Sequence, residues 1–401
     1  MTASLSWLDH SEYERRKYLD VIDMFRESGT VDELGLGTIR DVFADALFPG
    51  TSTIQTRAGY FLFVAWMYRE FERQKIPSSN IERAARNAEL RLIEGLVEGG
   101  ERSGVIGIAA RRALKRLPSN VYWNGLLSWG IRLFPGSQPQ YHRSMDSFNA
   151  SPRRSGRNED GEATEDAVRS NWHPHLPPPP DGFWKLASFE LRRVDAQYLQ
   201  ERIIARHPRT MLSFLVSDEK MRFPTDFPWE HPLVPELPGH IADQLHHARC
   251  FSEVMHGAPL LYNLMLAQAI PNEDQIQVYE LALARWTELM DERMPTLQRW
   301  DQARFWEHAE PAGHNVMRNT FIQRWFDLVL VPDAAARIGA NDVARHLIDT
   351  RETQLKGTRS RLHNDRALAL WNGFSGADQL NYRWPMTQTI LTDIQQGLQG
   401  A

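Results

Sequence analysis

Apolar residues recur at helical spacing along nearly all of the 401 residues, and the two-residue alternation of a strand is scarce. Side chains that repeat every three to four residues share one face of an α-helix and can be buried together. Glycine and proline separate the successive patterns, as they do where helices end. The sequence therefore predicts an all-α protein, with room for a small winged-helix-like β element at residues 131–134.

The helical patterns lie on both sides of a polar stretch in the middle of the chain. In the first part they cover residues 39–47, about 51–74 and 81–97, and a capping pattern at Ser11 and Glu14 predicts one more. In the second part they cover 194–206, 240–269, 273–292, 314–330, 342–354 and 384–396. Residues 260–269 are apolar nearly all round, so we expect Leu260, Leu261, Leu264 and Leu266 to be buried.

The polar stretch lies between Phe148 and Trp172, where Val168 is the only large apolar side chain. Such a segment buries too little surface to offset the entropy of ordering it. Four prolines follow at 177–180 and favour an extended polyproline II conformation. We expect three parts: a helical N-terminal domain (1–145), a flexible linker (146–171) and a helical C-terminal domain (172–401) with a proline-rich entry strip.

The composition excludes several classes of protein. The single cysteine, Cys250, excludes an internal disulfide and a thiolate zinc cluster, and it fits a reducing cytosol. The longest apolar run, residues 59–68, falls short of the roughly 20 residues that span a bilayer. The N-terminus lacks the basic and apolar regions of a secretory signal. We therefore expect a cytoplasmic protein without a membrane partner.

Charge is distributed unevenly along the chain. The formal net charge is −5, yet residues 102–143 carry seven Arg or Lys and no Asp or Glu. A solvated surface normally mixes the two signs, so a one-signed segment indicates an acidic partner such as nucleic acid. The net charge is +2 over residues 1–145, −2 over the linker and −5 over the remainder. The N-terminal domain is therefore the one expected to face a polyanion.

The basic segment has a local pattern of its own. Residues 107–117 suit a helix with apolar residues on one face and basic residues on the other. Pro118 ends that pattern, and Ser119 can cap a second helix that runs to Trp129. Two short helices and a tight turn resemble a helix-turn-helix or winged-helix unit. The alternative is a helical hairpin whose basic side chains are only solvated.

The predicted nucleic-acid contacts follow from this pattern. They are Arg111, Arg112, Lys115 and Arg116, with Arg57 and Arg132 as weaker candidates. The aromatic residues Tyr122 and Trp123 are expected in the core rather than stacked on bases.

No complete catalytic or metal-binding motif is present. The histidines at 173 and 175, at 246 and 247, and at 308 and 314 lack a strong ligand spacing, and cysteine ligands are missing. The chain has no phosphate-binding P-loop, and Gly35-Leu-Gly37 lacks the third glycine of a dinucleotide fingerprint. Asp218-Glu219-Lys220 has the residue types of a restriction-type nuclease without the strands that would place them. We therefore predict no catalytic residue, no metal and no cofactor.

Four segments resemble an uncharacterised bacterial family over essentially its full length. They are LGTIRDVFADALFPGTSTIQTR from Leu36, WHPHLPPPP from Trp172, MHGAPLLYNL from Met255, and the closing Tyr382-Arg-Trp pattern with Asp393-Ile and Gly397-Leu. The resemblance implies an association with anti-phage defence and DNA-modification gene islands, near helicases and phospholipase-D-like nucleases. It supplies no active-site residues.

Taken together, these features predict a non-enzymatic, DNA-associated subunit of an anti-phage defence system that works with a helicase or nuclease partner. The negative net charge favours a subunit over a stand-alone DNA-binding protein. Two alternatives stay open: a metal-dependent nuclease or other hydrolase with a site assembled from scattered residues, and a protein–protein adaptor without nucleic-acid contact.

Overall fold

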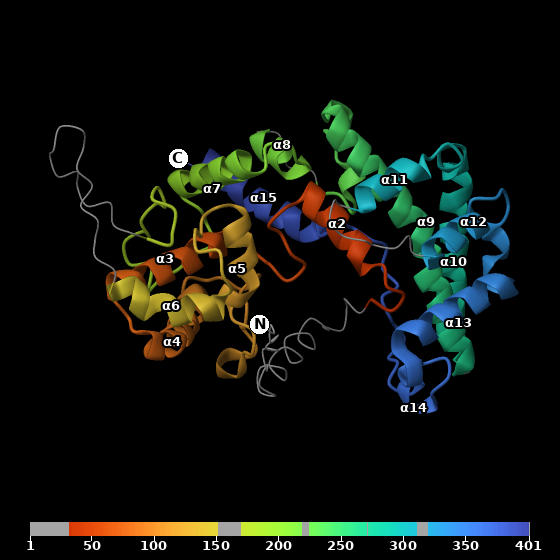
Figure 1. Ribbon diagram of the computed structural model, residues 1–401, viewed down its shortest axis with the longest axis horizontal. Helices are drawn as coiled ribbons and strands as arrows, with labels where there is room; N and C mark the ends of the chain where they lie inside the picture. Colours follow the sequence, from red (N-terminus) through yellow and green to blue (C-terminus); the bar gives the residue numbers. More distant parts are fainter. Residues whose placement is uncertain (1–31, 151–169, 219–223, 271, 311–319, 401) are drawn as a thin grey trace, which may run out of the picture. The chain divides into compact units, whose positions relative to one another are not determined.

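The computed structural model describes residues 32–150, 170–218, 224–270, 272–310 and 320–400, and in these ranges the protein is built of helices (Figure 1). The all-α prediction is confirmed. No strand occurs in the described ranges, and the β element predicted at 131–134 is reduced to one isolated antiparallel bridge between Arg132 and Trp172. The α-helices are α2 (Gly37–Leu47), α3 (Gly59–Arg73), α4 (Ser78–Glu98), α5 (Pro118–Ser128), α6 (Gln138–Ala150), α7 (Arg193–Arg206), α8 (Met211–Ser217), α9 (Gly239–Ala269), α10 (Glu273–Leu297), α11 (Gln302–Ala309), α12 (Thr320–Val329), α13 (Asp342–Lys356), α14 (Asp365–Leu368) and α15 (Trp384–Gln399).

Most predicted helices are present with ends shifted by a few residues, because apolar periodicity is a local property of the sequence. The predicted linker differs in part: residues 146–150 continue α6, and residues 151–169 lie outside the described ranges. The capping pattern at Ser11 and the first residues of the helix predicted at 314–330 also lie outside them.

Helix α3 begins at Gly59, several residues later than predicted. The preceding residues form turns whose backbone is bonded to distant side chains. Tyr122 Oη accepts hydrogen bonds from the backbone N–H of Thr56 (2.8 Å) and of Arg57 (3.1 Å). Backbone donors that already have such partners gain nothing from a helical turn. The start of α3 is therefore set by a contact that the local sequence does not contain.

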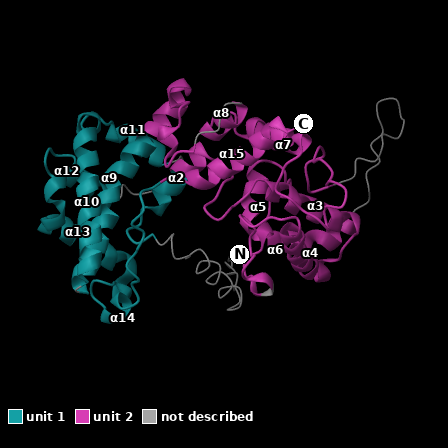
Figure 2. Ribbon diagram, turned by 180° about the vertical axis from the view of Figure 1, so that it is seen from behind, with its two compact units in different colours: residues 1–42, 247–380 teal, residues 43–246, 381–401 magenta. Residues whose placement is uncertain are grey.

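Two compact units make up the chain (Figure 2). Unit 1 consists of residues 1–42 and 247–380, and unit 2 consists of residues 43–246 and 381–401. Helices α2 and α9 contribute residues to both units. Residues on both sides of the predicted linker, 43–150 and 170–246, thus belong to the same unit.

The core of unit 2 is rich in aromatic side chains from α3 and α5. The rings of Phe61 and Trp129 stack with their centroids 3.8 Å apart, and Trp129 Nε1 donates to the backbone carbonyl of Pro49 (2.9 Å). The proline-rich strip lies against α3, where Trp66 Nε1 donates to the carbonyl of Pro177 (2.6 Å) and Arg69 donates to that of Leu176 (2.9 Å). The strip is therefore part of the packed unit.

In unit 1, α9 lies among α10, α12 and α13 (Figures 1 and 2). Leu260, Leu261, Leu264 and Leu266 are buried, as predicted. Helix α10 crosses α9 closely at Gly257, where a Cβ atom would lie 2.5 Å from the ring of Trp286. Trp286 Nε1 donates to the carbonyl of Glu253 (2.8 Å), and Trp325 Nε1 of α12 donates to that of Val254 (2.9 Å). Tryptophan donors thus fasten both neighbouring helices to α9.

Candidate nucleic-acid interface

The prediction of a helix at 107–117 is wrong, because the regular structure in this stretch is limited to a short 3-10 turn, η1 (Arg111–Ala113). Gly107 has φ +85° and Arg111 has φ +45°, and neither angle belongs to a right-handed helix. The Leu114 side chain folds back beside Gly107, where a Cβ atom would lie 2.5 Å from its Cδ2. The segment is therefore a folded-back loop, and its basic residues do not share one helix face.

Helix α4 supports this loop, which we call the basic loop (residues 107–116). Ile93 of α4 lies beside Gly107 at one end of the loop. At the other end, Nη1 of Arg86 donates to the backbone carbonyl of Leu114 (3.2 Å). Arg86 was not among the predicted contacts. The signal in the sequence is its spacing of one turn from Glu89, an acid at an apolar position of the helical pattern. The structure thus adds one cation to the loop.

The four basic residues of the loop differ in their surroundings. Arg111 and Lys115 are exposed, and Arg116 is half-buried. The side chain of Arg112 lies outside what the structure describes. Two of the predicted contacts are therefore accessible to a partner from solvent.

Arg57, a weaker candidate, binds a carboxylate of the protein itself. Its guanidinium forms two hydrogen bonds from Nε to Asp393 (3.0 and 2.9 Å) and an ion pair from Nη2 to the same carboxylate (2.9 Å). It also lies over the ring of Phe189, 4.6 Å from the centroid. Asp393 in turn accepts a hydrogen bond from Ala58 N–H at the start of α3 (2.8 Å). In this structure Arg57 joins α15 to α3.

Arg132, the other weaker candidate, is only 1% exposed. Its guanidinium donates to the backbone carbonyls of Trp123 (3.0 Å from Nη2), Gly136 (2.8 Å from Nη1) and Phe134, and it lies 4.4 Å from the ring centroid of Trp123. Burial lowers the pKa of Arg132 to about 10. The side chain is thus a buried cation that satisfies several carbonyl oxygens of unit 2.

The aromatic residues of the basic segment are largely in the core, as expected for Tyr122 and Trp123. Trp129 and Tyr141 are buried with them, and Phe134 is half-buried. These rings therefore pack mainly inside unit 2.

A buried acid lies at the C-terminal end of the basic loop. Glu89 of α4 is fully buried, and Oε1 of its carboxyl accepts a hydrogen bond from Ser119 N–H at the start of α5 (2.6 Å). Burial raises the pKa of Glu89 to about 7, although the bonds from Ser119 and the charge of Arg86 act in the opposite direction. An acid among the apolar positions of α4 is a sequence signal that could have identified it.

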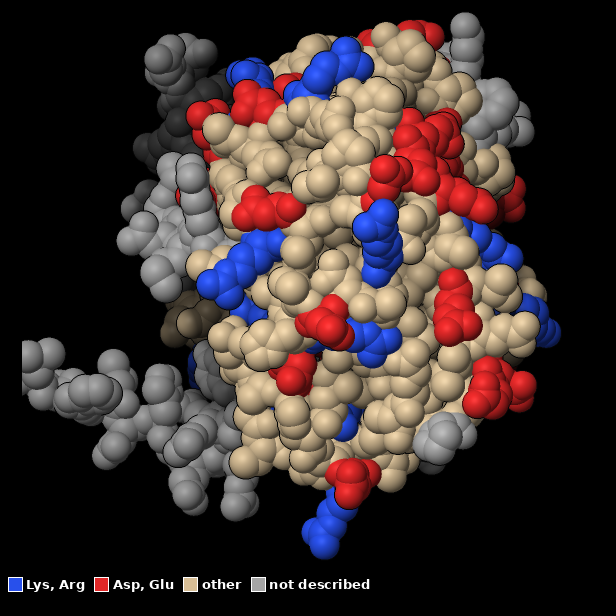
Figure 3. Space-filling view, turned by 90° about the vertical axis from the view of Figure 1, so that its right-hand side faces the viewer, with Lys and Arg blue, Asp and Glu red and all other residues tan. Residues whose placement is uncertain are grey.

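The face drawn in Figure 3 carries charges of both signs, with Lys and Arg among Asp and Glu and uncharged areas between them. Helix α4 itself exposes Glu82 and Glu94 besides Arg83 and Arg91. The absence of acidic residues is therefore a property of the loop, and neither the face in Figure 3 nor the exposed side of α4 shares it.

The histidines show contacts that fit packing. Nε2 of His173 lies within hydrogen-bond distance of Arg202, so this residue helps to dock the proline-rich strip. The rings of His247 and His308 lie 5.2 Å apart, but Trp300 Nε1 donates to Nδ1 of His247 (2.8 Å). A metal-ligating histidine instead usually donates its second N–H to an acceptor. His314 and most of the Asp218-Glu219-Lys220 motif lie outside the described residues.

Three comparisons bear on this arrangement. The family model that matches the chain covers residues 2–397 and is described as a family of unknown function (DUF6361). No curated protein and no solved structure matches. Among the described helices, none has the length and apolar character needed to cross a bilayer.

Proposed function

The chain belongs to this family of unknown function, and we propose that it is a nucleic-acid-associated subunit that binds phosphate groups through the basic loop. The observation that carries the proposal is the exposure of Arg111 and Lys115 on a segment without a single acidic residue from 102 to 143. Arg86, anchored to the loop at Leu114, adds a third cation nearby.

The contact we propose reads the backbone of the nucleic acid and not its bases. Long basic side chains on a loop reach phosphate oxygens without entering a groove in a defined register. The aromatic side chains that could stack on bases are largely buried. Binding is therefore expected to be weakly dependent on sequence and strongly dependent on salt.

The net charge of −5 argues for a subunit. A polyanion is repelled by the overall field of such a protein, so two or three cations hold it weakly unless a partner contributes further contacts. We propose a non-enzymatic role beside a helicase or a phospholipase-D-like nuclease in anti-phage defence, and the choice of these partners rests on the resemblance stated from the sequence.

The test is a pair of double variants with equal charge. Arg111→Ala with Lys115→Ala removes the two exposed cations of the loop. Arg193→Ala with Arg209→Ala removes two exposed cations elsewhere in unit 2. For duplex DNA, the slope of log affinity against log salt should fall by about 1.8 in the first variant, or about 0.9 for each lost contact, and should change little in the second.

Both variants should unfold within about 0.5 kcal/mol of the wild type, because exposed side chains contribute little to stability. Equal loss of binding in the two double variants would reduce the effect to net charge and contradict the proposal. Absence of salt-dependent binding to single- or double-stranded DNA or RNA, alone and with the native partner, would favour the adaptor. Cleavage of DNA or RNA by the purified protein with Mg²⁺, Mn²⁺ or Zn²⁺ would favour the hydrolase.

A further inference from the structure

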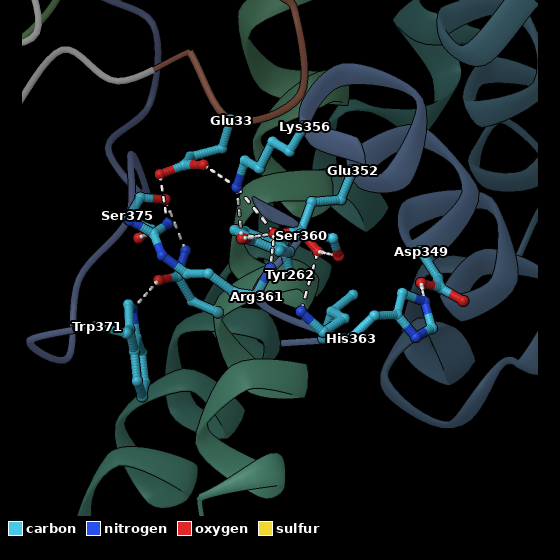
Figure 4. Close-up of polar contacts among 12 residues, drawn as sticks. Glu33, Tyr262, Asp349, Glu352, Lys356, Ser360, Arg361, His363, Trp371 and Ser375 are labelled. Atoms are coloured by element: carbon cyan, nitrogen blue, oxygen red, sulfur yellow. Dashed lines mark hydrogen bonds and ion pairs between the residues drawn. The ribbon is translucent and has the colours of Figure 1, made fainter. Parts of the chain in front are cut away.

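A second cluster of ionisable groups lies in unit 1, at the end of α13 (Figure 4). At its centre is Glu352, which is fully buried. Oε1 accepts hydrogen bonds from Tyr262 Oη (2.5 Å), Lys356 Nζ (2.8 Å) and the backbone N–H of Arg361 (2.9 Å). Oε2 accepts from Ser360 Oγ (2.6 Å) and from Leu362 N–H (3.1 Å). Five donors leave this carboxylate little capacity for another ligand.

The donors also determine its charge. Burial alone would raise the pKa of Glu352, but the hydrogen bonds from Lys356, Ser360 and Tyr262 outweigh burial and lower the pKa to about 2. Glu352 is therefore an ionised group that holds Lys356 and Tyr262 in position.

Two cations beside Glu352 are positioned by the frame of unit 1. Lys356 Nζ donates to Glu352 and to Tyr262 Oη (2.9 Å). Nη1 of Arg361 donates to Ser375 Oγ (2.8 Å), and its backbone N–H donates to Glu352. The side chains of Lys356 and Arg361 are 18% and 22% exposed, so part of each lies at the surface of unit 1.

Glu33 fills the position between these cations. Its Oε2 forms an ion pair with Lys356, and its Oε1 accepts from Nη1 of Arg361 (2.5 Å). Glu33 belongs to a segment far away in the sequence, which Arg351 Nε also holds by donating to the carbonyl of Leu34 (2.8 Å). The positions of Lys356 and Arg361 thus have supports that do not depend on Glu33.

The charges show which ligand this position fits. Without Glu33, the single negative charge of Glu352 faces the two positive charges of Lys356 and Arg361. One excess positive charge in a largely buried place favours one monoanion. Two cations, one at each oxygen, match the two oxygens of a carboxylate, whereas a dianionic phosphate would leave the cluster negative.

We propose that Lys356 and Arg361, framed by Glu352, Tyr262 and Ser375, form a carboxylate-binding site that Glu33 occupies as an intramolecular ligand. An acidic side chain of a partner peptide takes the same site when Glu33 is withdrawn. Glu33 and the acidic side chain of the partner then compete for Lys356 and Arg361, so binding of the partner releases the Glu33 side chain from the site.

The first experiment is chemical rescue of the Glu33→Ala variant with acetate. This variant should melt at a lower temperature than the wild type, because two partly buried cations lose one of their acceptors. Acetate should raise its melting temperature progressively, relative to chloride at equal ionic strength, because a ligand of the native state stabilises it by mass action. No such rise is expected for the wild type or for the Glu33→Gln variant, because their own side chain fills the site. The same holds for the control Glu292→Ala, which changes an exposed residue.

The double variant Glu33→Ala/Arg361→Met tests where acetate binds. Loss of the rescue in this variant would place acetate at the proposed site, and an unchanged rescue would contradict the proposal. If Glu33→Ala is unfolded in chloride, the same comparison is made by circular dichroism: native helicity regained in acetate supports the site, and no regain overturns it. Equal stabilisation of all variants by acetate would also overturn it, because that is a general salt effect.

The second experiment tests the peptide. A fluorescent peptide with one glutamate between glycines should bind Glu33→Ala at least about tenfold more tightly than it binds the wild type, which corresponds to removal of the internal competitor. Acetate should displace it, and the same peptide with glutamine should not bind. Rescue by acetate without binding of the peptide would show a site for small carboxylates and overturn the assignment of an acidic peptide.

Discussion

Glu352 in unit 1 and Glu89 in unit 2 are both fully buried carboxyl groups on long helices, yet their pKa values move in opposite directions. Burial raises the pKa of each, because an ion loses its hydration. Glu352 is compensated by five donors, and its pKa falls to about 2. Glu89 accepts from Ser119 at Oε1, its Oε2 has no hydrogen-bond partner among the described residues, and its pKa rises to about 7.

Because both groups are buried, their difference lies in the donors: Glu352 has five, one of them the cation of Lys356, whereas in the described ranges Glu89 is bonded by Ser119 alone. In unit 1 the donors come from α9, α13 and the loop after α13, so the charge joins several elements. In unit 2 the carboxyl group touches the start of α5. We therefore expect the stability of unit 2, and not the charge of Glu352, to change with pH near neutrality.

Removal of the Glu352 carboxylate should have the largest effect. Glu352→Ala leaves the hydroxyls of Tyr262 and Ser360 without their acceptor and leaves Glu33, among the described residues, as the only carboxylate paired with Lys356. It should lower the free energy of unfolding by about 3–5 kcal/mol. Urea unfolding at pH 7 measures the loss. Glu352→Gln, which keeps one acceptor oxygen, should lose less. A loss below about 1 kcal/mol in the alanine variant would mean that the donors find water instead.

The buried cation of unit 2 extends the comparison to the opposite charge. Arg132→Met keeps much of the apolar stem but removes the guanidinium donors to the carbonyls of Trp123, Phe134 and Gly136. The Gly136 carbonyl still accepts from Trp123 Nε1 (3.1 Å), and we expect a loss of about 2–4 kcal/mol. Arg111→Met in the basic loop is the matched control and should change stability by less than about 0.5 kcal/mol. Similar unfolding midpoints for the two variants would show that Arg132 contributes no more to the free energy of unfolding than an exposed cation does.

The pH dependence of Glu89 is the smallest effect and tests the comparison most directly. Below pH 4.5 its carboxyl is protonated in the folded and unfolded states, so its full stability is present. Between pH 4.5 and about 7 the unfolded state ionises first, and stability should fall by up to about 3 kcal/mol, at 1.36 kcal/mol for each pKa unit. Above pH 7 both states are ionised, and the fall should stop.

Glu89→Gln should lack this fall, so the difference in urea midpoint between variant and wild type should grow in favour of the variant from pH 4.5 to pH 7. Other titrating groups cancel in that difference. A difference that stays constant with pH would mean that Glu89 has an ordinary pKa, and the contrast with Glu352 would then be lost.

The helices and much of the core could be predicted from the sequence. Apolar spacing identified α7, α9, α13 and α15 within a few residues, and the apolar residues from 260 to 269 are buried. The basic loop was recognised by composition, but its conformation was not. Its helical pattern loses to the docking of Leu114 beside Gly107, because in a helix these two residues would share a face but lie two turns apart.

The roles of the arginines show the same limit. Arg57, Arg111 and Arg132 are equivalent in a count of charge, yet Arg111 is exposed, Arg132 is buried among carbonyls, and Arg57 is bonded to Asp393 across more than three hundred residues of sequence. A charge is free to meet a partner only if the fold does not supply one first.

The sequence by itself determined the helical class, the burial of the apolar stripes and the place of the acid-free segment, because each of these depends on residues that are neighbours along the chain. The tertiary structure alone decided which charges are available, which are internal, and which acids are ionised. Those properties depend on partners from distant segments, such as Glu33 beside Lys356 and Ser119 beside Glu89. Solvation and donor count are set only where such segments meet.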